Sequence, residues 1–441
     1  MTAKIIVFDD DPTGSQTVHS CPLLLRWDVD TLRLGLRDPA PILFILANTR
    51  ALTEPEAIAT TTAVCRNLKI ALTQENIQEY LIVSRSDSTL RGHFPAETEA
   101  IANVLGPFDA CFFAPAFFEG GRITRNGIHY VQENERLIPV AETEFAGDRL
   151  FGFQNSFLPD FIATKTQGAV TAAQVDCLSP GNLPETLLDY FRELQNGKYV
   201  VLDGEQQADF DRLVPALFQA IHQGKKFLFR SAASLLTSLA DLGPQPIPPE
   251  KSFTVRRSPQ PGLIIVGSHT QKTTVQLAEL LQLAGVVGIE IDVELCQTSL
   301  GRDQLAVAML EQIPKIRQAG QTPVLFTSRQ VVASDQAQHN LEFGKNITAL
   351  FLKILAQLPA DLGFVISKGG NTTNALLQKG LRVPVIQLRG QIIPGCCLVQ
   401  TEHDHPQFPL LPVVLFPGNV GDHHSLVTAY QRLQIPSQST I

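Results

Sequence analysis

Charged residues are scarce in this sequence. Asp, Glu, Lys and Arg make up 18% of the 441 residues, below the usual quarter, while 44% are hydrophobic, and this balance excludes a disordered or fibrous chain. The formal net charge is −8, and the densest basic clusters are only the pairs Lys225–Lys226 and Arg256–Arg257. Because binding to nucleic acid or to an anionic membrane needs a strong basic patch, we expect neither as a partner.

Long apolar runs and regular cysteine spacings are also absent. No run approaches the ~18 apolar residues of a membrane span, and the start "MTAKIIVFDD" lacks the pattern of a signal peptide. The seven cysteines are odd in number and irregularly spaced, which predicts reduced thiols rather than a disulfide framework or a CxxC metal site. We therefore expect a cytoplasmic protein.

What the sequence does contain is a series of short apolar runs that alternate with amphipathic stretches. Examples are "KIIVF", "YLIVS" and "KFLFR" in the first half and "GLIIVGS", "PVLFTS" and "GFVIS" in the second. Such continuous apolar strands, separated by helices, predict mostly parallel sheets that are covered on both faces. The fold class is therefore α/β, with two doubly wound, mostly parallel-sheet domains.

The clearest boundary is the proline-rich segment 243–262, "GPQPIPPEKSFTVRRSPQPG". Its six prolines in twenty residues are incompatible with a continuing helix or strand. We predict an N-terminal domain over 1–245, a linker over 246–261 and a C-terminal domain over 262–441. Ligands of open parallel sheets bind beyond the carboxyl ends of the strands, so the loops that follow the strands are the candidate sites.

The start of one helix and both ends of another can be predicted from the sequence. Thr53 followed by Glu56 forms a capping-box pattern at the start of one helix. Apolar residues at helical spacing predict a second helix from Lys272 to Ala284, with Gly285 placed to cap its carboxyl end.

The stretch "FDDDPTGSQ" at 8–16 places three adjacent carboxylates behind the apolar run "IIVF". Such carboxylates repel one another and lose hydration if the segment packs, so a cationic partner or bulk water must compensate them. A metal ion, arginines from elsewhere in the fold and water are all open possibilities at this point.

Polar clusters also end three other predicted strands of the N-terminal half: "NTRAL", "SRSDSTLRGH" and "EGGRITRNGIHY". Arginine binds carboxylate bidentately, and aspartate suits sugar hydroxyls and Mg²⁺, so this set fits a small polyhydroxy acid. The simpler alternative is that Asp, Asn, Ser and Gly only form turns. The candidates are Asp10, Asp11, Arg50, Arg85, Asp87, Ser88, Thr89, Arg91 and Arg122.

The C-terminal half is richer in Gly/Thr loops: "GSHTQKTT", "SKGGNTTN", "RGQIIPG" and "FPGNVGDHHS". The first follows a strand and opens a helix, a geometry in which backbone N–H groups hold phosphate. It is not a Walker motif, because Gln271 stands where the glycine before Lys272 is required. Helix capping alone would explain one such loop, whereas four in one domain favour nucleotide binding.

Histidines occur beside acidic residues in "GDHH" and "EHDHP". Adjacent residues are expected to point apart, and no third ligand has a suitable spacing, so we predict no metal site at His423 and His424.

Seven of these pieces, in order along nearly the whole chain, resemble the four-carbon acid sugar kinase family. They are "DDDPTGSQTVH", "SRSDSTLRGH", "GGRITRNGIHYV", "GSHTQKTTVQL", "SKGGNTT", "GQIIPG" and "FPGNVGD". The resemblance implies a sugar-acid-binding N-terminal domain, a nucleotide-binding C-terminal domain and ATP-dependent phosphorylation of a hydroxyl in the cleft between them.

The resemblance also implies roles for individual residues. Asp10 or Asp11 would be the catalytic base, with Arg50, Arg85, Asp87, Ser88, Arg91 and Arg122 around the acceptor. ATP, with Mg²⁺, would be bound by Ser268, Lys368, Gly369, Gly370, Asn371, Thr372, Gly418 and Gly421. We expect a small sugar acid such as a threonate, an erythronate or an oxo-tetronate as the acceptor.

Two other functions are open from the sequence. "IIVFDDDPT" also matches the Asp-x-Asp-x-Thr signature of haloacid-dehalogenase-type phosphatases, through Asp9, Asp11 and Thr13. That function leaves the C-terminal glycine loops unexplained. A non-catalytic sensor that binds a sugar acid and a nucleotide is the second alternative.

Overall fold

The computed structural model describes residues 3–133, 136–329 and 337–435, with side chains omitted for 337–343. The chain divides into two compact units, Met1–Gly243 and Pro244–Ile441. Each is an α/β unit built on a mostly parallel sheet, as the sequence predicts. Within the described ranges, no helix combines the length and the apolar character that crossing a membrane requires.

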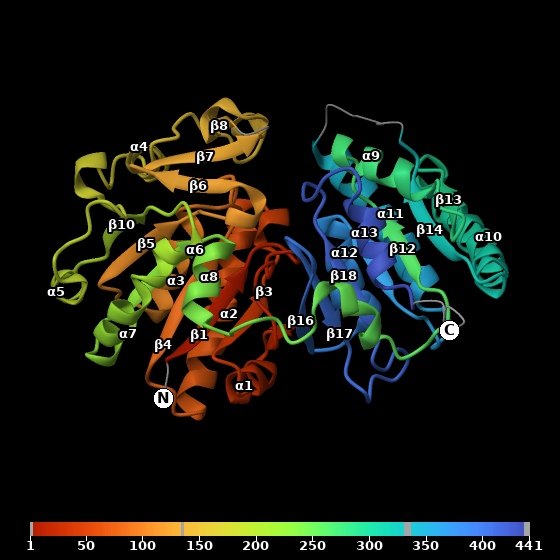
Figure 1. The fold of residues 1–441 in the computed structure, drawn as a ribbon, viewed down its shortest axis with the longest axis horizontal. Coiled ribbons are helices and arrows are strands. Elements are labelled where there is room, and N and C mark those ends of the chain that lie inside the picture. Colours follow the sequence, from red (N-terminus) through yellow and green to blue (C-terminus); the bar gives the residue numbers. More distant parts are fainter. Residues whose placement is uncertain (1–2, 134–135, 330–336, 436–441) are drawn as a thin grey trace, which may run out of the picture. The chain divides into compact units, whose positions relative to one another are not determined.

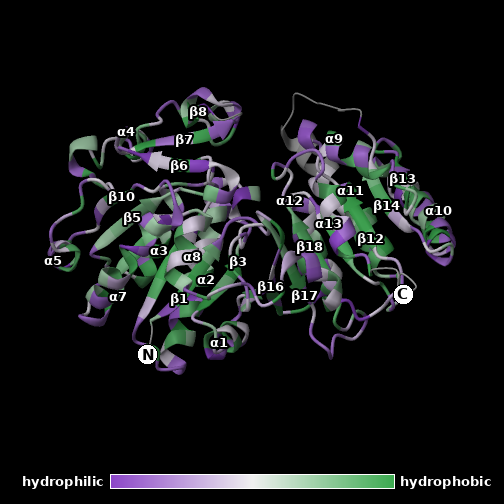
Figure 2. Ribbon diagram, viewed as in Figure 1, coloured by the Kyte–Doolittle hydropathy of each residue, from purple (hydrophilic) through white to green (hydrophobic). Residues whose placement is uncertain are grey.

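The main sheet of unit 1 has the strand order β2-β3-β1-β4-β11-β5-β10-β9, and all neighbours are parallel (Figure 1). Its strands are β1 Lys4–Asp9, β2 Cys21–Leu24, β3 Ile42–Leu46, β4 Tyr80–Arg85, β5 Ala110–Ala114, β9 Asp176–Leu178, β10 Lys198–Leu202 and β11 Phe227–Ser231. The central strands are almost entirely buried and apolar, and they are green in Figure 2. Burial on both faces explains why they read as continuous apolar runs rather than alternating ones.

The helices of unit 1 flank this sheet, and a small antiparallel sheet lies above it in the view of Figure 1. The small sheet comprises β6 Arg122–Arg125, β7 Ile128–Glu133 and β8 Arg136–Pro139. The helices are α1 Val29–Arg37, α2 Glu54–Gln74, α3 Ala96–Leu105, α4 Leu158–Lys165, α5 Leu187–Glu193, α6 Gln207–Asp211, α7 Val214–His222 and α8 Ala233–Ala240. The predicted capping box of Thr53 and Glu56 is confirmed at the start of α2.

Unit 2 has the strand order β13-β14-β12-β15-β18-β17-β16. The first five strands are parallel, whereas β18, β17 and β16 are antiparallel neighbours. The strands are β12 Leu263–Val266, β13 Val286–Ile291, β14 Thr322–Thr327, β15 Val365–Lys368, β16 Val385–Ile393, β17 Cys396–Gln400 and β18 Pro412–Phe416. The helices are α9 Gln271–Leu280, α10 Ser299–Gln318, α11 Ala337–Leu355, α12 Gly370–Ala375 and α13 Ser425–Arg432.

The end predicted for the helix at 272–284 is wrong. Helix α9 stops at Leu280, and residues 281–285 form turns before β13. The N–H of Leu283 bonds the carbonyl of Leu280, and the N–H of Val286 bonds that of Leu283. Apolar spacing continues beyond the helix because these turn residues also face the core of unit 2.

The proline-rich segment is not an extended chain. Pro249–Val255 forms a 3-10 helix, in which proline is tolerated in the first turn. Its end is held to unit 2, because Gln400 Nε2 donates to the Val255 carbonyl (2.8 Å) and Arg256 Nη1 donates to the Leu433 carbonyl (2.7 Å).

Candidate active site

The three carboxylates after β1 are compensated by arginines from neighbouring strand ends. Asp10 is buried, and Arg50 donates to its two oxygens from Nε (3.0 Å) and Nη2 (2.5 Å). Ser86 Oγ donates a third hydrogen bond to Asp10 (3.2 Å). Both oxygens of Asp10 are therefore occupied.

Asp9, the last residue of β1, lies in the interior of unit 1. It is fully buried, and its Oδ1 is 3.5 Å from Arg85 Nη1, since β1 and β4 pair Asp9 with Arg85. Burial raises the pKa of Asp9 to about 7, and Arg85 opposes this rise. Arg85 also donates to Gln16 through Nη2 (3.0 Å), while its buried Nε has no hydrogen-bond partner among the described residues, so Arg85 stays a candidate for acceptor binding.

Asp11 is the most accessible of the three. Its side chain is 19% exposed, against 2% for Asp10. Its Oδ1 accepts from the N–H of Thr13 (2.8 Å) and from the Thr13 hydroxyl, whereas Oδ2 has only a long contact with Arg50 Nη1 (3.5 Å). One oxygen of Asp11 is thus held and the other is available.

A second group of charges surrounds Asp87, which follows β4. Arg91 Nε donates to its Oδ2 (2.6 Å), and the Thr89 hydroxyl donates to the same atom. Burial would raise the pKa of Asp87, but Arg91 and Arg50 outweigh it and hold the pKa well below the usual range. Asp87 therefore stays ionised and orients Arg91.

Arg122, at the start of β6, is buried close to the same charges. Burial lowers its pKa; the nearby Asp87 raises it, and Arg91 lowers it further. Arg122 Nη1 donates to the Gly120 carbonyl, but Nε is buried and has no hydrogen-bond partner among the residues that the structure describes. Arg122 therefore has a donor that can bind an anionic group of a ligand.

Ser88 contributes through its backbone. Its carbonyl accepts a hydrogen bond from His129 Nε2 (2.7 Å), which ties the loop after β4 to strand β7. Burial lowers the pKa of His129 to about 4, so this imidazole is neutral and structural.

Gly92 and Arg230 also border this site, and neither was predicted from the sequence. Gly92 has φ +127°, and a Cβ there would lie 2.7 Å from Ser86 Oγ and 2.7 Å from Arg230 Nη2. Arg230, at the end of β11, bonds Glu97 (2.7 Å) and Ser84 (2.8 Å) in the buried interior. The glycine in "LRGH" was the one available signal, whereas nothing local to "KFLFR" marked Arg230.

In unit 2, the Gly/Thr loops meet at the carboxyl ends of β12, β15 and β18. Thr273 Oγ1 donates to Ser268 Oγ (3.0 Å), and Thr270 Oγ1 donates to the Gly418 carbonyl (2.8 Å). Thr270 also caps α9 by accepting from the N–H of Thr273, as the simpler interpretation of this loop expected. Loops 148 residues apart in sequence thus form one group of hydroxyl and backbone groups.

Glycines allow these loops to approach one another. Gly369 has φ +115°, and a Cβ there would lie 3.1 Å from Ser268; a Cβ on Gly418 would lie 2.7 Å from Ser268 Oγ. A Cβ on Gly267 would overlap the hydroxyl of Thr372 at 2.0 Å. The structure therefore brings Ser268, Gly369, Thr372 and Gly418 together.

The remaining predicted residues lie at the edges of this group. Gly370 opens α12, and the neighbouring Asn371 is exposed. Gly421 faces Ser425 and Gln276 instead of Ser268, so it positions the loop against α9 and α13.

Cations gather around these loops. Lys368 is fully buried, with Nζ donating to the Pro417 carbonyl (3.0 Å) and lying 3.8 Å from the centre of the Phe416 ring. Burial lowers its pKa to about 7; the Cys396 thiol opposes this, and the charges of Lys272 and Arg329 add to the lowering.

Arg329 is a candidate that the sequence analysis missed. It follows β14, and its Nη1 donates to the Ser268 carbonyl (2.5 Å), while its buried Nε and Nη2 have no hydrogen-bond partner within the described part of the chain. Burial lowers its pKa, which the Glu290 carboxylate opposes. Like Arg122 in unit 1, it presents unused donors, here beside the loop that opens α9.

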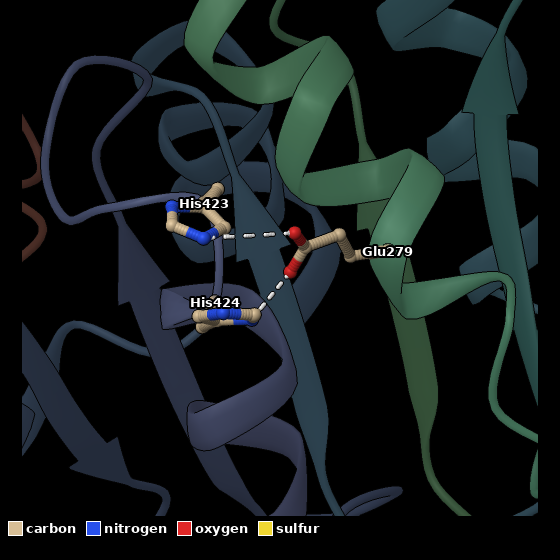
Figure 3. A group of neighbouring side chains, drawn as sticks. All are labelled: Glu279, His423 and His424. Atoms are coloured by element: carbon tan, nitrogen blue, oxygen red, sulfur yellow. Dashed lines mark ion pairs between the residues drawn. The ribbon is translucent and has the colours of Figure 1, made fainter.

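The expectation that His423 and His424 point apart is wrong. Figure 3 shows both imidazoles directed toward the carboxylate of Glu279 on α9. The carboxylate that meets them comes from a helix about 145 residues earlier in the sequence.

Fold and site together define a two-unit α/β protein with arginines and carboxylates at the strand ends of one unit and Gly/Thr loops with cations at those of the other. Residues 5–239 match the family model of a sugar-binding N-terminal domain. Residues 263–426 match the family model of a nucleotide-binding C-terminal domain. The chain belongs to the four-carbon acid sugar kinase family, as its motifs predicted. It is an ATP-using phosphotransferase.

Two curated relatives carry kinase names. The D-erythronate kinase of Heliobacterium modesticaldum is 21% identical over 419 residues, which cover 89% of each chain. The D-threonate kinase of Bordetella bronchiseptica is 29% identical over 216 residues, covering 47% of this chain and 48% of that protein.

Two solved structures share the fold. A Salmonella typhimurium LT2 protein has a TM-score of 0.70 at 19% identity, covering 97% of this chain and 98% of its own. A Haemophilus influenzae protein has a TM-score of 0.65 at 15% identity, covering 98% of this chain and 100% of its own. At these identities the likeness concerns the fold alone.

The phosphatase alternative is not supported. Its nucleophile would be Asp9, whose carboxylate is fully buried beside Arg85.

Proposed function

We propose that this kinase phosphorylates a hydroxyl of a four-carbon sugar acid of the erythronate or threonate type. The names of the two curated relatives support this acceptor class. The single observation that carries it is the buried Arg122 beside Arg91 and Asp87, with its Nε unpartnered among the described residues, because a guanidinium binds carboxylate while aspartate suits hydroxyls.

Asp11 is proposed as the general base. Phosphoryl transfer depends on positioning and charge neutralisation, with a carboxylate accepting the proton of the attacking hydroxyl. Asp11 has an available oxygen, whereas Asp10 is occupied by Arg50 and Ser86. Asp10 then acts as a positioning residue that fixes Arg50 at the edge of the acceptor site.

The nucleotide is proposed to lie on the loops of unit 2. Ser268, Gly369, Thr372 and Gly418 would offer hydroxyl and backbone groups to the phosphates. Lys368 and Arg329 would supply positive charge. A phosphate placed near Lys368 should favour its protonated form, whose pKa burial has lowered.

Mg²⁺ is proposed to accompany ATP and to neutralise charge on the transferred phosphoryl group. Mg²⁺ keeps several waters and binds few carboxylates. We also propose a cytoplasmic location.

The activity is tested by ADP release with Mg²⁺, ATP and a panel of threonates, erythronates and their oxo forms. We expect ADP release that depends on one of these acids. Binding of both ligands without ADP release would instead identify a sensor. Phosphate release from phosphorylated sugars in the absence of ATP would revive the phosphatase.

Arg329 gives a separate test of the nucleotide site. Arg329→Ala removes a charge-assisted contact worth about 1.5–3 kcal/mol, so KM for ATP should rise about 10- to 150-fold with KM for the acid nearly unchanged. Arg302→Ala is the matched control, because Arg302 also donates to backbone carbonyls of unit 2, those of Cys296 and Gln297. Equal effects of the two variants would contradict a phosphate contact.

A further inference from the structure

Glu279, His423 and His424 form a cluster at the surface of unit 2 that the kinase reaction does not use. His424 Nδ1 lies 2.7 Å from Glu279 Oε2, and His423 Nε2 lies 3.9 Å from Oε1 (Figure 3). One ligand atom from each side chain lies within 4.8 Å of the others. The two imidazole centres are 4.0 Å apart.

We propose that these three side chains bind a transition-metal ion, with Zn²⁺ as the preferred ion. Zinc binds imidazole nitrogen and carboxylate oxygen at about 2.0–2.2 Å, which places tetrahedral donors about 3.3 Å apart. The two measured separations, 2.7 and 3.9 Å, fall on either side of that value. Because one donor atom of each side chain lies within 4.8 Å of the others, side-chain rotation would let all three bind one ion, with water in the fourth position.

The chemistry of the ligands separates this site from the metal of the kinase reaction. Mg²⁺ prefers oxygen ligands, whereas two imidazoles and one carboxylate suit Zn²⁺, Ni²⁺ or Cu²⁺. The side chains are also accessible to an ion, with exposed fractions of 56% for His423, 64% for His424 and 30% for Glu279.

The backbone that carries the ligands is held in place. Gln276, one turn before Glu279 on α9, donates to the carbonyls of Val420 (3.2 Å) and Asp422 (2.6 Å). Asp422 Oδ1 accepts from the N–H of His424 (3.0 Å) and from Ser425 Oγ (2.8 Å). The approach of the histidines to α9 therefore rests on buried and local hydrogen bonds as well as on the His–Glu ion pairs.

A bound ion would connect α9 to the loop before α13. That loop continues from Gly418 and Gly421, so the metal would restrict the same segment that borders Ser268. The expected physical effect is stabilisation of unit 2, because a metal that binds only the folded state shifts unfolding toward higher temperature.

The test is calorimetric titration of ZnCl₂ into the full chain without a histidine tag. We expect one ion per chain, and His424→Ala and Glu279→Gln should each weaken binding at least about tenfold. His222→Ala is the matched control, because His222 forms the same kind of exposed pair with Glu79, also at 2.7 Å, and should leave binding unchanged.

A second measurement excludes a folding artefact. Without metal, the three variants should unfold at the wild-type temperature, since the substituted side chains are exposed or half-buried. Zn²⁺ should raise the unfolding temperature of the wild type and of His222→Ala but not of His424→Ala. No zinc uptake by the wild type, or uptake unchanged in His424→Ala, would overturn the proposal.

Discussion

Asp11→Asn should lower kcat by about 10²-fold or more while acceptor affinity changes little. The asparagine can keep Oδ1 in place for the N–H and the hydroxyl of Thr13, so the loop retains its shape. What it loses is the basicity of the second oxygen, which is the group proposed to accept the proton. Steady-state kinetics of ADP release, with unfolding temperature as the folding control, measure the effect.

Asp9→Asn is the matched control for this prediction. The pKa of Asp9 is raised to about 7, so the protonated carboxyl is already populated near neutral pH. Asparagine resembles this protonated form, and most of the turnover should therefore remain. If Asp11→Asn recovers its turnover at high Mg²⁺, Asp11 holds the metal and is not the base. Full turnover in both Asp10→Asn and Asp11→Asn would move the base elsewhere, with Asp87 as the next candidate.

Arg122→Ala should raise KM for the sugar acid about 10- to 150-fold and leave KM for ATP nearly unchanged. The loss of a charge-assisted hydrogen bond costs about 1.5–3 kcal/mol, and tenfold in affinity corresponds to about 1.4 kcal/mol. Among the described residues the buried Nε of Arg122 has no hydrogen-bond partner, so the substitution removes few internal hydrogen bonds beyond the bond to Gly120, and the unfolding temperature controls for lost packing.

Arg125→Ala is its matched control, because Arg125 lies on the same strand, β6, and forms an exposed ion pair with Glu205. Exposed pairs contribute little to stability, so this variant should behave as wild type. An Arg122→Ala enzyme with unchanged KM for every four-carbon acid would show that Arg122 is structural and that the carboxylate binds elsewhere.

The strand ends could be predicted because a β-strand buried on both faces appears in the sequence as a continuous apolar run. The apolar run "KIIVF" had to end where Asp9 begins, and β1 ends there. The capping box of Thr53 and Glu56 was equally secure, because its partners are three residues apart. Where the determining contact is local, the residue types alone are sufficient.

The antiparallel end of the second sheet was not foreseen. Strands β17 and β18 were not predicted from the sequence. Their apolar runs resemble those of parallel strands in composition, and only the pairing with β16 and β15 defines their direction. Composition records burial, but it does not record which neighbour a strand bonds.

The sequence by itself determined that carboxylates, arginines and glycine loops would follow the buried strands, and its motifs determined the family. Only the tertiary structure decided which cation meets which carboxylate: Asp10 takes Arg50 from 40 residues away, and Glu279 meets His424 from 145 residues away. Arg329 also acquires its place beside Ser268 only through folding. The physical reason is that charges interact across a few ångströms of space, and parallel crossovers bring strand ends together regardless of their separation along the chain.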